Sequence, residues 1–253
     1  MHVYEVVLDE RKWKGFCRIL EGLKECCSAA VIKGGVIRQM SNCGLALFEV
    51  DMTSLLGDSN FVLPLEEENL RMLRLFTGQV KITVHSNSFL FSDEKNTLTF
   101  INYPGLGVNE FINEAKFRSL LNDVFKGTTL LLKHTIDQRI RQIFKDVSSL
   151  YGRIFFNVIF QGHCAYIGEE KIYIHKLCSL KINQTIPLAK PILGKAKVLL
   201  FGLRSFNYDG DIGWELYGKG GINGLDITSK YYGFIEDIKL ITYTRGLWEN
   251  DLD

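Results

Sequence analysis

The sequence has almost no net charge and no long hydrophobic run. Thirty Lys and Arg residues balance twenty-nine Asp and Glu residues, so the formal net charge over 253 residues is +1. No apolar run approaches the roughly 18 to 20 residues of a membrane-spanning helix, and the opening MHVYEVVLDERK lacks the order of a secretion signal. No global basic excess indicates nucleic acid, and we expect a soluble, cytoplasmic protein.

Signals for metal binding, nucleotide binding or catalysis are also scarce. The six cysteines form no CxxC pair and no metal-ligand spacing with the five histidines. Reduced, mostly buried thiols are therefore favoured over disulfides or zinc ligands. The glycine-rich stretches GLGVNE (105–110) and GKGGINGLD (218–226) lack the Lys-Ser/Thr of a phosphate-binding loop, which favours turns over nucleotide sites. No constellation selects an enzymatic site.

Composition and periodicity indicate a folded chain built mostly of short strands. Hydrophobic residues make up 46% of the chain and charged residues 23%, which is typical of a globular protein with one or two domains. Over the first hundred residues the pattern predicts strand, helix, strands, helix, strands. The two helices are predicted at 10–28 and 66–76, and the second begins with carboxylates that suit the positive end of a helix dipole.

The same order of elements then repeats in the second half. A strand at 129–134 precedes an amphipathic helix at 135–151, which Thr135 is expected to cap, and more strands follow. The segment 186–196 is expected to form a short helical turn broken at Pro191. The repetition predicts two similarly built domains.

Between the two halves lies a segment with no counterpart elsewhere in the chain. Its pattern over residues 108–127 predicts one further helix. We therefore expect a first domain, a connector with an extra helix, and a second domain, with limits at 1–104, 105–128 and 129–253.

The predicted helix at 10–28 separates apolar from charged side chains. At about 100° per residue one stripe faces a core, and its members are Trp13, Phe16, Leu20, Leu23 and Cys27. Roughly opposite lie three cations accompanied by two carboxylates, namely Arg11, Lys14, Arg18, Glu21 and Glu25. An exposed basic helix face is usually only solvated surface.

The later helix repeats this arrangement. Its apolar stripe consists of Ile136, Ile140, Ile143, Phe144 and Val147. Arg141 and Lys145 are expected to project from the far side. On the short helix at 66–76, Arg71 is expected to point away from the core with Arg74 on its flank. The equivalent placement of cations in both halves makes plain solvation a weaker explanation than it is for either helix alone.

The order strand, basic amphipathic helix, strands and shorter second helix, given twice, resembles the sliding clamps of DNA replication. The resemblance is carried by FCRILEGLKECCSAAVIKGGVIRQMSNCGLALFEVDM, HTIDQRIRQIFKDVSSLYGRIFFNVIFQGHCAYIG, KVLLFGLR, WELYGKGG and YGFIEDIKLIT. It is closest to the trimeric clamps of T-even-type phages, with eukaryotic and archaeal trimeric clamps next. The resemblance implies an α+β fold of two similar clamp domains, with antiparallel sheets outside and amphipathic helices on the inner face.

Function also follows from the resemblance as an expectation. It implies a homotrimer that closes head to tail around double-stranded DNA and tethers a replicative DNA polymerase, with an ATP-dependent clamp loader as partner. No catalytic residue, cofactor or metal is then needed. The implied DNA-contacting residues are Arg11, Lys14, Arg18, Arg71, Arg74, Arg141, Lys145, Lys190 and Lys195. The extra connector helix departs from the family pattern, so no docking residues for partners are assigned.

Two other functions remain open at this stage. One is a monomeric or dimeric processivity factor that holds DNA by a basic face alone, and the other is a strand-rich enzyme. The end of the chain, TRGLWENDLD (244–253), is expected to follow the last strand as a free or packed tail. Its alternative role is contact of Trp248 with a partner or neighbouring subunit.

Overall fold

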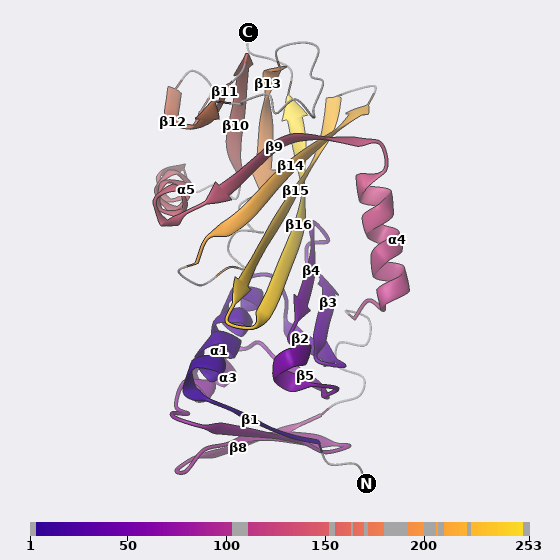
Figure 1. Ribbon diagram of the computed structural model, residues 1–253, viewed down its shortest axis with the longest axis vertical. Helices are drawn as coiled ribbons and strands as arrows, with labels where there is room; N and C mark the ends of the chain where they lie inside the picture. The colour runs from indigo at the N-terminus through magenta and orange to yellow at the C-terminus, as the bar shows by residue number, and fades with distance from the viewer. Residues whose placement is uncertain are drawn as a thin grey trace. The chain divides into compact units, whose positions relative to one another are not determined.

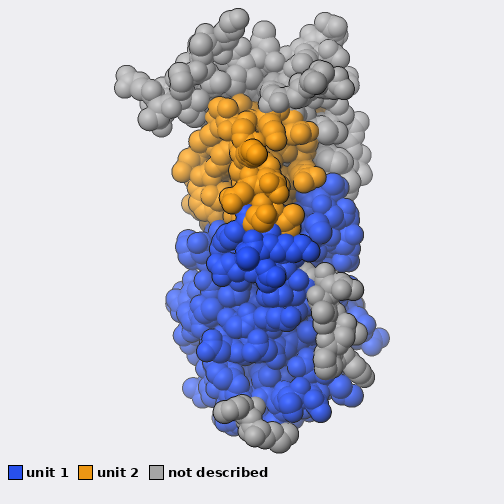
Figure 2. All heavy atoms as spheres, turned by 90° about the vertical axis from the view of Figure 1, so that its right-hand side faces the viewer, with its two compact units in different colours: residues 1–118, 204–208, 233–242 blue, residues 119–203, 209–232, 243–253 orange. Residues whose placement is uncertain are grey.

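The computed structural model of the chain divides into two compact units (Figures 1 and 2). It describes residues 4–102, 111–151, 155–162, 164–169, 172–179, 192–199, 206, 210–221 and 224–249. Unit 1 comprises residues 1–118, 204–208 and 233–242, and unit 2 comprises residues 119–203, 209–232 and 243–253. The chain therefore returns to unit 1 near its end. The domain limits expected from the sequence stay a prediction.

Unit 1 contains two antiparallel sheets. The first has the order β1-β6-β7-β8, with bounds Tyr4–Leu8, Val80–Val84, Ser88–Ser92 and Thr97–Ile101. The second includes the order β4-β3-β2-β5, with bounds Ala46–Asp51, Val36–Met40, Ala29–Lys33 and Asn60–Pro64. Alternation along the strands sends Ile82, Phe89 and Phe91 into a shared core, where they are fully buried.

Three helices accompany these sheets: α1 (Glu10–Lys24), α2 (Thr53–Leu56) and α3 (Glu67–Leu73). Asp9 caps α1, because its carboxylate accepts a hydrogen bond from the amide of Lys12 at 2.9 Å. The predicted apolar stripe of this helix is confirmed, since each of its five members is at most 4% exposed. The indole of Trp13 lies 5.4 Å from the ring of Phe91, so α1 is anchored on the first sheet.

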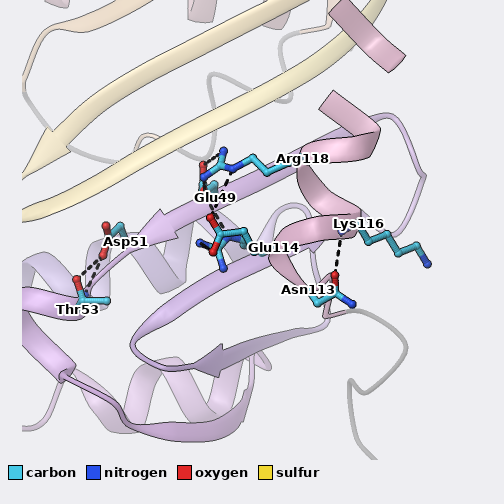
Figure 3. A network of polar contacts seen from close by, with 8 residues as sticks. Glu49, Asp51, Thr53, Asn113, Glu114, Lys116 and Arg118 are labelled. Carbon is cyan, nitrogen blue, oxygen red and sulfur yellow. Dashed lines mark hydrogen bonds and ion pairs between the residues drawn. The ribbon is translucent and has the colours of Figure 1, made fainter. Parts of the chain in front are cut away.

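The connector helix predicted from the sequence is present as α4, Glu114–Phe125. A nearly buried carboxylate ties its beginning to unit 1 (Figure 3). Glu49 on β4 accepts a hydrogen bond from Nε of Arg38 at 3.1 Å and two from Arg118, at 3.1 and 2.7 Å. The amide of Ile112 donates to the carbonyl of Arg38 at 2.8 Å. Two guanidinium groups thus satisfy one carboxylate that is 8% exposed.

The described part of unit 2 contains the helix α5 (Gln138–Tyr151) and two series of paired strands. One series of neighbouring strands is β12-β11-β10-β13-β16, with bounds Ile172–Ser179, Cys164–Glu169, Phe155–Gly162, Ile192–Leu199 and Ile238–Glu249. The other is β9-β14-β15, with bounds Thr128–Ile136, Ile212–Gly221 and Gly224–Ile235. Residues 233–235 of β15 and 238–242 of β16 belong to unit 1. Phe144 of α5 meets the buried ring of Trp214 edge to face, at 6.2 Å between centroids.

Three local expectations are wrong in unit 2. Thr135 does not cap the helix, because it lies in β9 opposite Gly213. Asp137 takes that role, with its carboxylate 2.8 Å from the amide of Ile140. The part of 186–196 that the structure describes is strand β13 and not a helical turn, since it pairs with β10 along its whole length.

The third wrong expectation concerns the end of the chain. A turn at Glu236 and Asp237 divides the predicted closing strand, and the chain continues as β16 to Glu249. Trp248 lies opposite Ala196 of β13 in the register of the sheet. The segment expected to be a tail is therefore largely part of a strand, because backbone pairing with β13 extends the ladder beyond its hydrophobic pattern.

Replacing Glu49 with Gln tests the anchor of the connector. The substitution keeps the shape of the side chain but leaves two guanidinium groups around a neutral amide, so we expect a loss of about 1 to 3 kcal/mol in unfolding free energy. Denaturant unfolding measures this loss, and faster hydrogen exchange at the Ile112 amide should accompany it. Glu114→Gln is the control, since this side chain is 63% exposed. Equal losses in both variants would contradict the prediction.

Candidate nucleic-acid interface

Helix α1 presents a row of cations on the side opposite its core face. Arg11, Lys14 and Arg18 follow one another at intervals of three and four residues, which keeps them on one side of a helix. All three are exposed, and the side chains of Arg11 and Lys14 are 81% and 66% exposed. The exposure predicted for these three residues is therefore confirmed.

The row of cations borders a hollow in the surface of unit 1. The hollow has a volume of about 440 Å³, and its lining consists of Glu10, Arg11, Lys14, Gly15, Arg18, Ile235 and Glu236. Three cations and two carboxylates thus share one concave surface. The net positive potential of such a surface is weak, because the carboxylates offset the charge of the cations.

Carboxylates already pair with two of the three cations. Arg11 forms an ion pair with Glu236, and Lys14 forms one with Glu10 at 2.6 Å along the helix. Arg18 makes no ion pair with any residue that the structure describes. The hydrogen bond that Arg11 donates to Glu236, followed by the charge of the same carboxylate, raises the pKa of Arg11 above its ordinary value. Exposed pairs of this kind contribute little to stability, because water and salt screen them.

Helix α3 lies beside α1 and contributes paired cations to the same unit (Figure 1). Arg74 is 2.7 Å from Glu21 of α1, and Arg71 is 3.1 Å from Glu67 within its own helix. Lys24 of α1 also contacts Glu67. Both arginines are exposed as expected. Their charges are locally balanced, so α3 adds little net positive potential to the row on α1.

Arg141 departs from the expected site in unit 2. Its side chain is 8% exposed, and its guanidinium donates a hydrogen bond to the carbonyl of Gly210. The prediction that Arg141 projects outward is therefore wrong. A helical wheel places this residue away from the apolar stripe, but the segment at Gly210 covers that flank of α5.

The remaining candidates of unit 2 are only partly placed. Lys145 lies on α5, one turn after Arg141, and its side chain is outside the described part of the structure. Lys190 also falls outside the described residues. Lys195 is on β13, opposite Ile159 of β10, rather than on a helix. Contact of these residues with DNA stays a prediction.

Sequence reasoning missed one exposed cation on α5. Arg139 is exposed near the start of the helix, next to the buried Ile140. A helical wheel of α5 places Arg139 nearer to the apolar stripe than Arg141, so side-chain spacing predicts that Arg139 is the less exposed of the two. Only the packing of neighbouring segments reverses the order of exposure of these two arginines, so no local signal identifies Arg139.

The structure offers no sign of a metal centre in its described part. No group of three or more His, Cys, Asp or Glu side chains there is close enough to hold an ion. None of the described helices is long and apolar enough to cross a membrane. The exposed cations of α1 are thus the strongest candidate site for a charged ligand among the residues that the structure describes.

Solved structures share the fold along nearly the whole chain. The PCNA2-PCNA3 complex of Sulfolobus tokodaii matches with a TM-score of 0.57 and 12% identity, over 96% of this chain and 98% of that chain. Proliferating cellular nuclear antigen of Entamoeba histolytica matches with a TM-score of 0.59 and 13% identity, over 97% and 99%. The beta subunit of DNA polymerase III of Thermotoga maritima matches with a TM-score of 0.54 and 9% identity, and the 97% of this chain that is covered corresponds to 65% of that subunit.

These likenesses define the fold class. No protein-family model and no curated protein matches the chain significantly. The chain nevertheless has an α+β fold of the PCNA-like clamp class, with large antiparallel sheets and few helices. The resemblance to sliding clamps is confirmed at this level, whereas the particular affinity to phage clamps stays a prediction. At identities of 9 to 13% the likeness establishes the fold alone.

Alanine at Arg141 and at Arg18 should separate a structural arginine from a surface arginine. Arg141→Ala removes a buried hydrogen-bonded group, so we expect a loss of about 1 to 3 kcal/mol in unfolding free energy. Arg18→Ala removes an exposed group of the same charge and should change stability by no more than about 0.5 kcal/mol. Thermal and denaturant unfolding measure both. Equal stability of the two variants would contradict the buried position of Arg141.

Proposed function

We propose that the protein is a sliding clamp, which closes into a ring around duplex DNA and tethers a replicative DNA polymerase. One observation carries the proposal. In a chain with the PCNA-like clamp fold, the helix whose apolar face forms the core of unit 1 presents Arg11, Lys14 and Arg18 on its exposed face. This role is one of binding, so it requires no catalytic residue and no cofactor.

The chemistry of the α1 face suits contact with phosphates rather than bases. Phosphate contacts by Lys and Arg are independent of sequence, and every position along a duplex is then nearly equivalent in energy. The carboxylates beside Arg11 and Lys14 weaken each contact. A weak and mobile contact permits sliding, and a closed ring keeps the protein on the DNA without tight binding.

Closure requires an interface between different surfaces of neighbouring subunits. Among the described strands, β8 is at the end of the first sheet of unit 1, and β12 is at the end of a strand series in unit 2. Edge strands offer unpaired backbone groups to a strand of another chain. One such edge in each unit is what head-to-tail assembly needs. We propose three subunits, and a polymerase and an ATP-dependent clamp loader as partners.

A topological retention experiment tests the ring. The protein is mixed with linear biotin-ended duplex at low salt, the ends are blocked with streptavidin or left free, and high salt is then added. A ring stays only on blocked DNA, and its mass in solution is about three times 28.9 kDa. A monomer or dimer that binds by a basic face leaves both substrates, because salt screens phosphate contacts. That outcome would replace the ring with the non-ring processivity factor.

Charge reversal tests the surface. We expect Arg18→Glu combined with Lys145→Glu to preserve the mass and the fold but to reduce retention on DNA and polymerase processivity severalfold, because each change places a carboxylate near phosphates. Lys95→Glu with Lys126→Glu makes the same change in net charge at exposed positions off these helices and should have little effect. If both double variants retain DNA equally well, DNA does not run along α1 and α5.

A further inference from the structure

A turn far along the chain places two carboxylates against helix α1. Glu236 and Asp237 form the turn between β15 and β16 and belong to unit 1. Glu236 pairs with Arg11, and Oδ2 of Asp237 lies 3.7 Å from Nζ of Lys12. The Glu236 side chain is 25% exposed, whereas that of Arg11 is 81% exposed. The carboxylate of Glu236 is therefore less accessible to water than the guanidinium of Arg11.

The position of this turn is built into the fold. A Cβ atom at Gly15 would lie 3.3 Å from side-chain atoms of both Ile235 and Glu236, so glycine permits this close approach to α1. The hydroxyl of Ser54 donates a hydrogen bond to the carbonyl of Asp237 at 3.2 Å. Glu236 has a φ of 51°, a left-handed conformation that non-glycine residues adopt rarely. Packing and backbone geometry thus hold both carboxylates in place.

The turn places a competing carboxylate at the cations that a phosphate would bind. Glu236 lines the same hollow as Arg11, Lys14 and Arg18. A phosphate that approaches Arg11 must replace a carboxylate, whereas at a solvated cation it would replace water and a dissolved anion. Since phosphate binding normally depends on salt through released counterions, pairing with a fixed carboxylate should reduce both affinity and salt dependence.

We propose that Glu236 and Asp237 are affinity-limiting residues of the α1 surface, which compete with DNA phosphates for Arg11 and Lys12. The inference rests on the proposed clamp function, because DNA is the polyanion it invokes. Competition of this kind keeps the ring mobile on DNA. Without it the face would bind the backbone more tightly, and each step along the duplex would require the rupture of stronger contacts.

The test compares isosteric neutral variants. Glu236→Gln combined with Asp237→Asn removes both charges and preserves the shape of the turn, and Asp237→Asn alone preserves the Arg11 pair as a second variant. Asp58→Asn combined with Glu94→Gln is the matched control, since both residues are exposed in unit 1 and make the same change in net charge. Affinity for a short linear duplex is measured by fluorescence anisotropy at several salt concentrations.

We expect the turn double variant to bind several times more tightly than the control, and Asp237→Asn alone to give part of that gain. The magnitude of the slope of log affinity against log salt should rise by about 1 to 2, because each freed cation releases roughly 0.9 counterion on binding a phosphate. Arg11→Gln should weaken binding more in the turn double variant than in the original chain, which a double-mutant cycle quantifies.

Two different failures are distinguishable. If the original protein binds DNA and Arg18→Glu weakens that binding, but the turn variants match the control, then the inference is wrong and the proposed clamp function stands. If neither the original protein nor any variant binds duplex DNA at low salt, both are overturned. Circular dichroism and solution mass verify that each variant retains fold and assembly.

Discussion

The packing of Trp13 in the core of unit 1 is the contact on which the candidate site depends. Its ring lies between 5.4 and 5.8 Å from those of Phe16, Phe76 and Phe91, which come from the helix itself, the segment after α3 and strand β7. Truncation of a buried aromatic side chain of this kind typically costs about 3 to 5 kcal/mol. The strength of this anchor fixes the rotation of α1 about its axis, and the rotation decides which side chains remain in water.

Once the orientation of the helix is fixed, the net charge of its exposed face depends on the side chains of neighbouring segments. Cations on that face form a row, yet Glu10 of α1 itself and Glu236 of the β15–β16 turn pair with two of its three members. A protein with a net charge of +1 therefore has no strongly basic patch here. A largely compensated row of cations would bind a polyanion weakly, whereas an uncompensated row would bind it more tightly.

Local pattern was sufficient for some predictions and insufficient for others. The apolar stripe of α1 and the connector helix follow from hydrophobic spacing, because one face of a helix must be buried. The cap of α5 was misassigned, since β9 extends through Thr135 and leaves Asp137 as the capping residue. The prediction that Arg141 is exposed is wrong, because its burial depends on a contact with Gly210. A helical wheel shows only the spacing within α5 and gives no information on such a contact. In both cases pairing with a distant segment overrides a local preference.

The sequence by itself determined the amphipathic helices and the exposed positions of Arg11, Lys14 and Arg18, and its resemblance to sliding clamps implied the α+β class. The helix faces depend on side-chain spacing within a few turns of chain, which hydrophobic burial converts directly into orientation. Only the tertiary structure decided that Glu236 meets Arg11, that Glu21 meets Arg74 and that Arg141 is buried. Ion pairs between distant segments, and the burial of one segment's side chains by another, depend on how sheets and helices pack. Local spacing of residues does not contain that information.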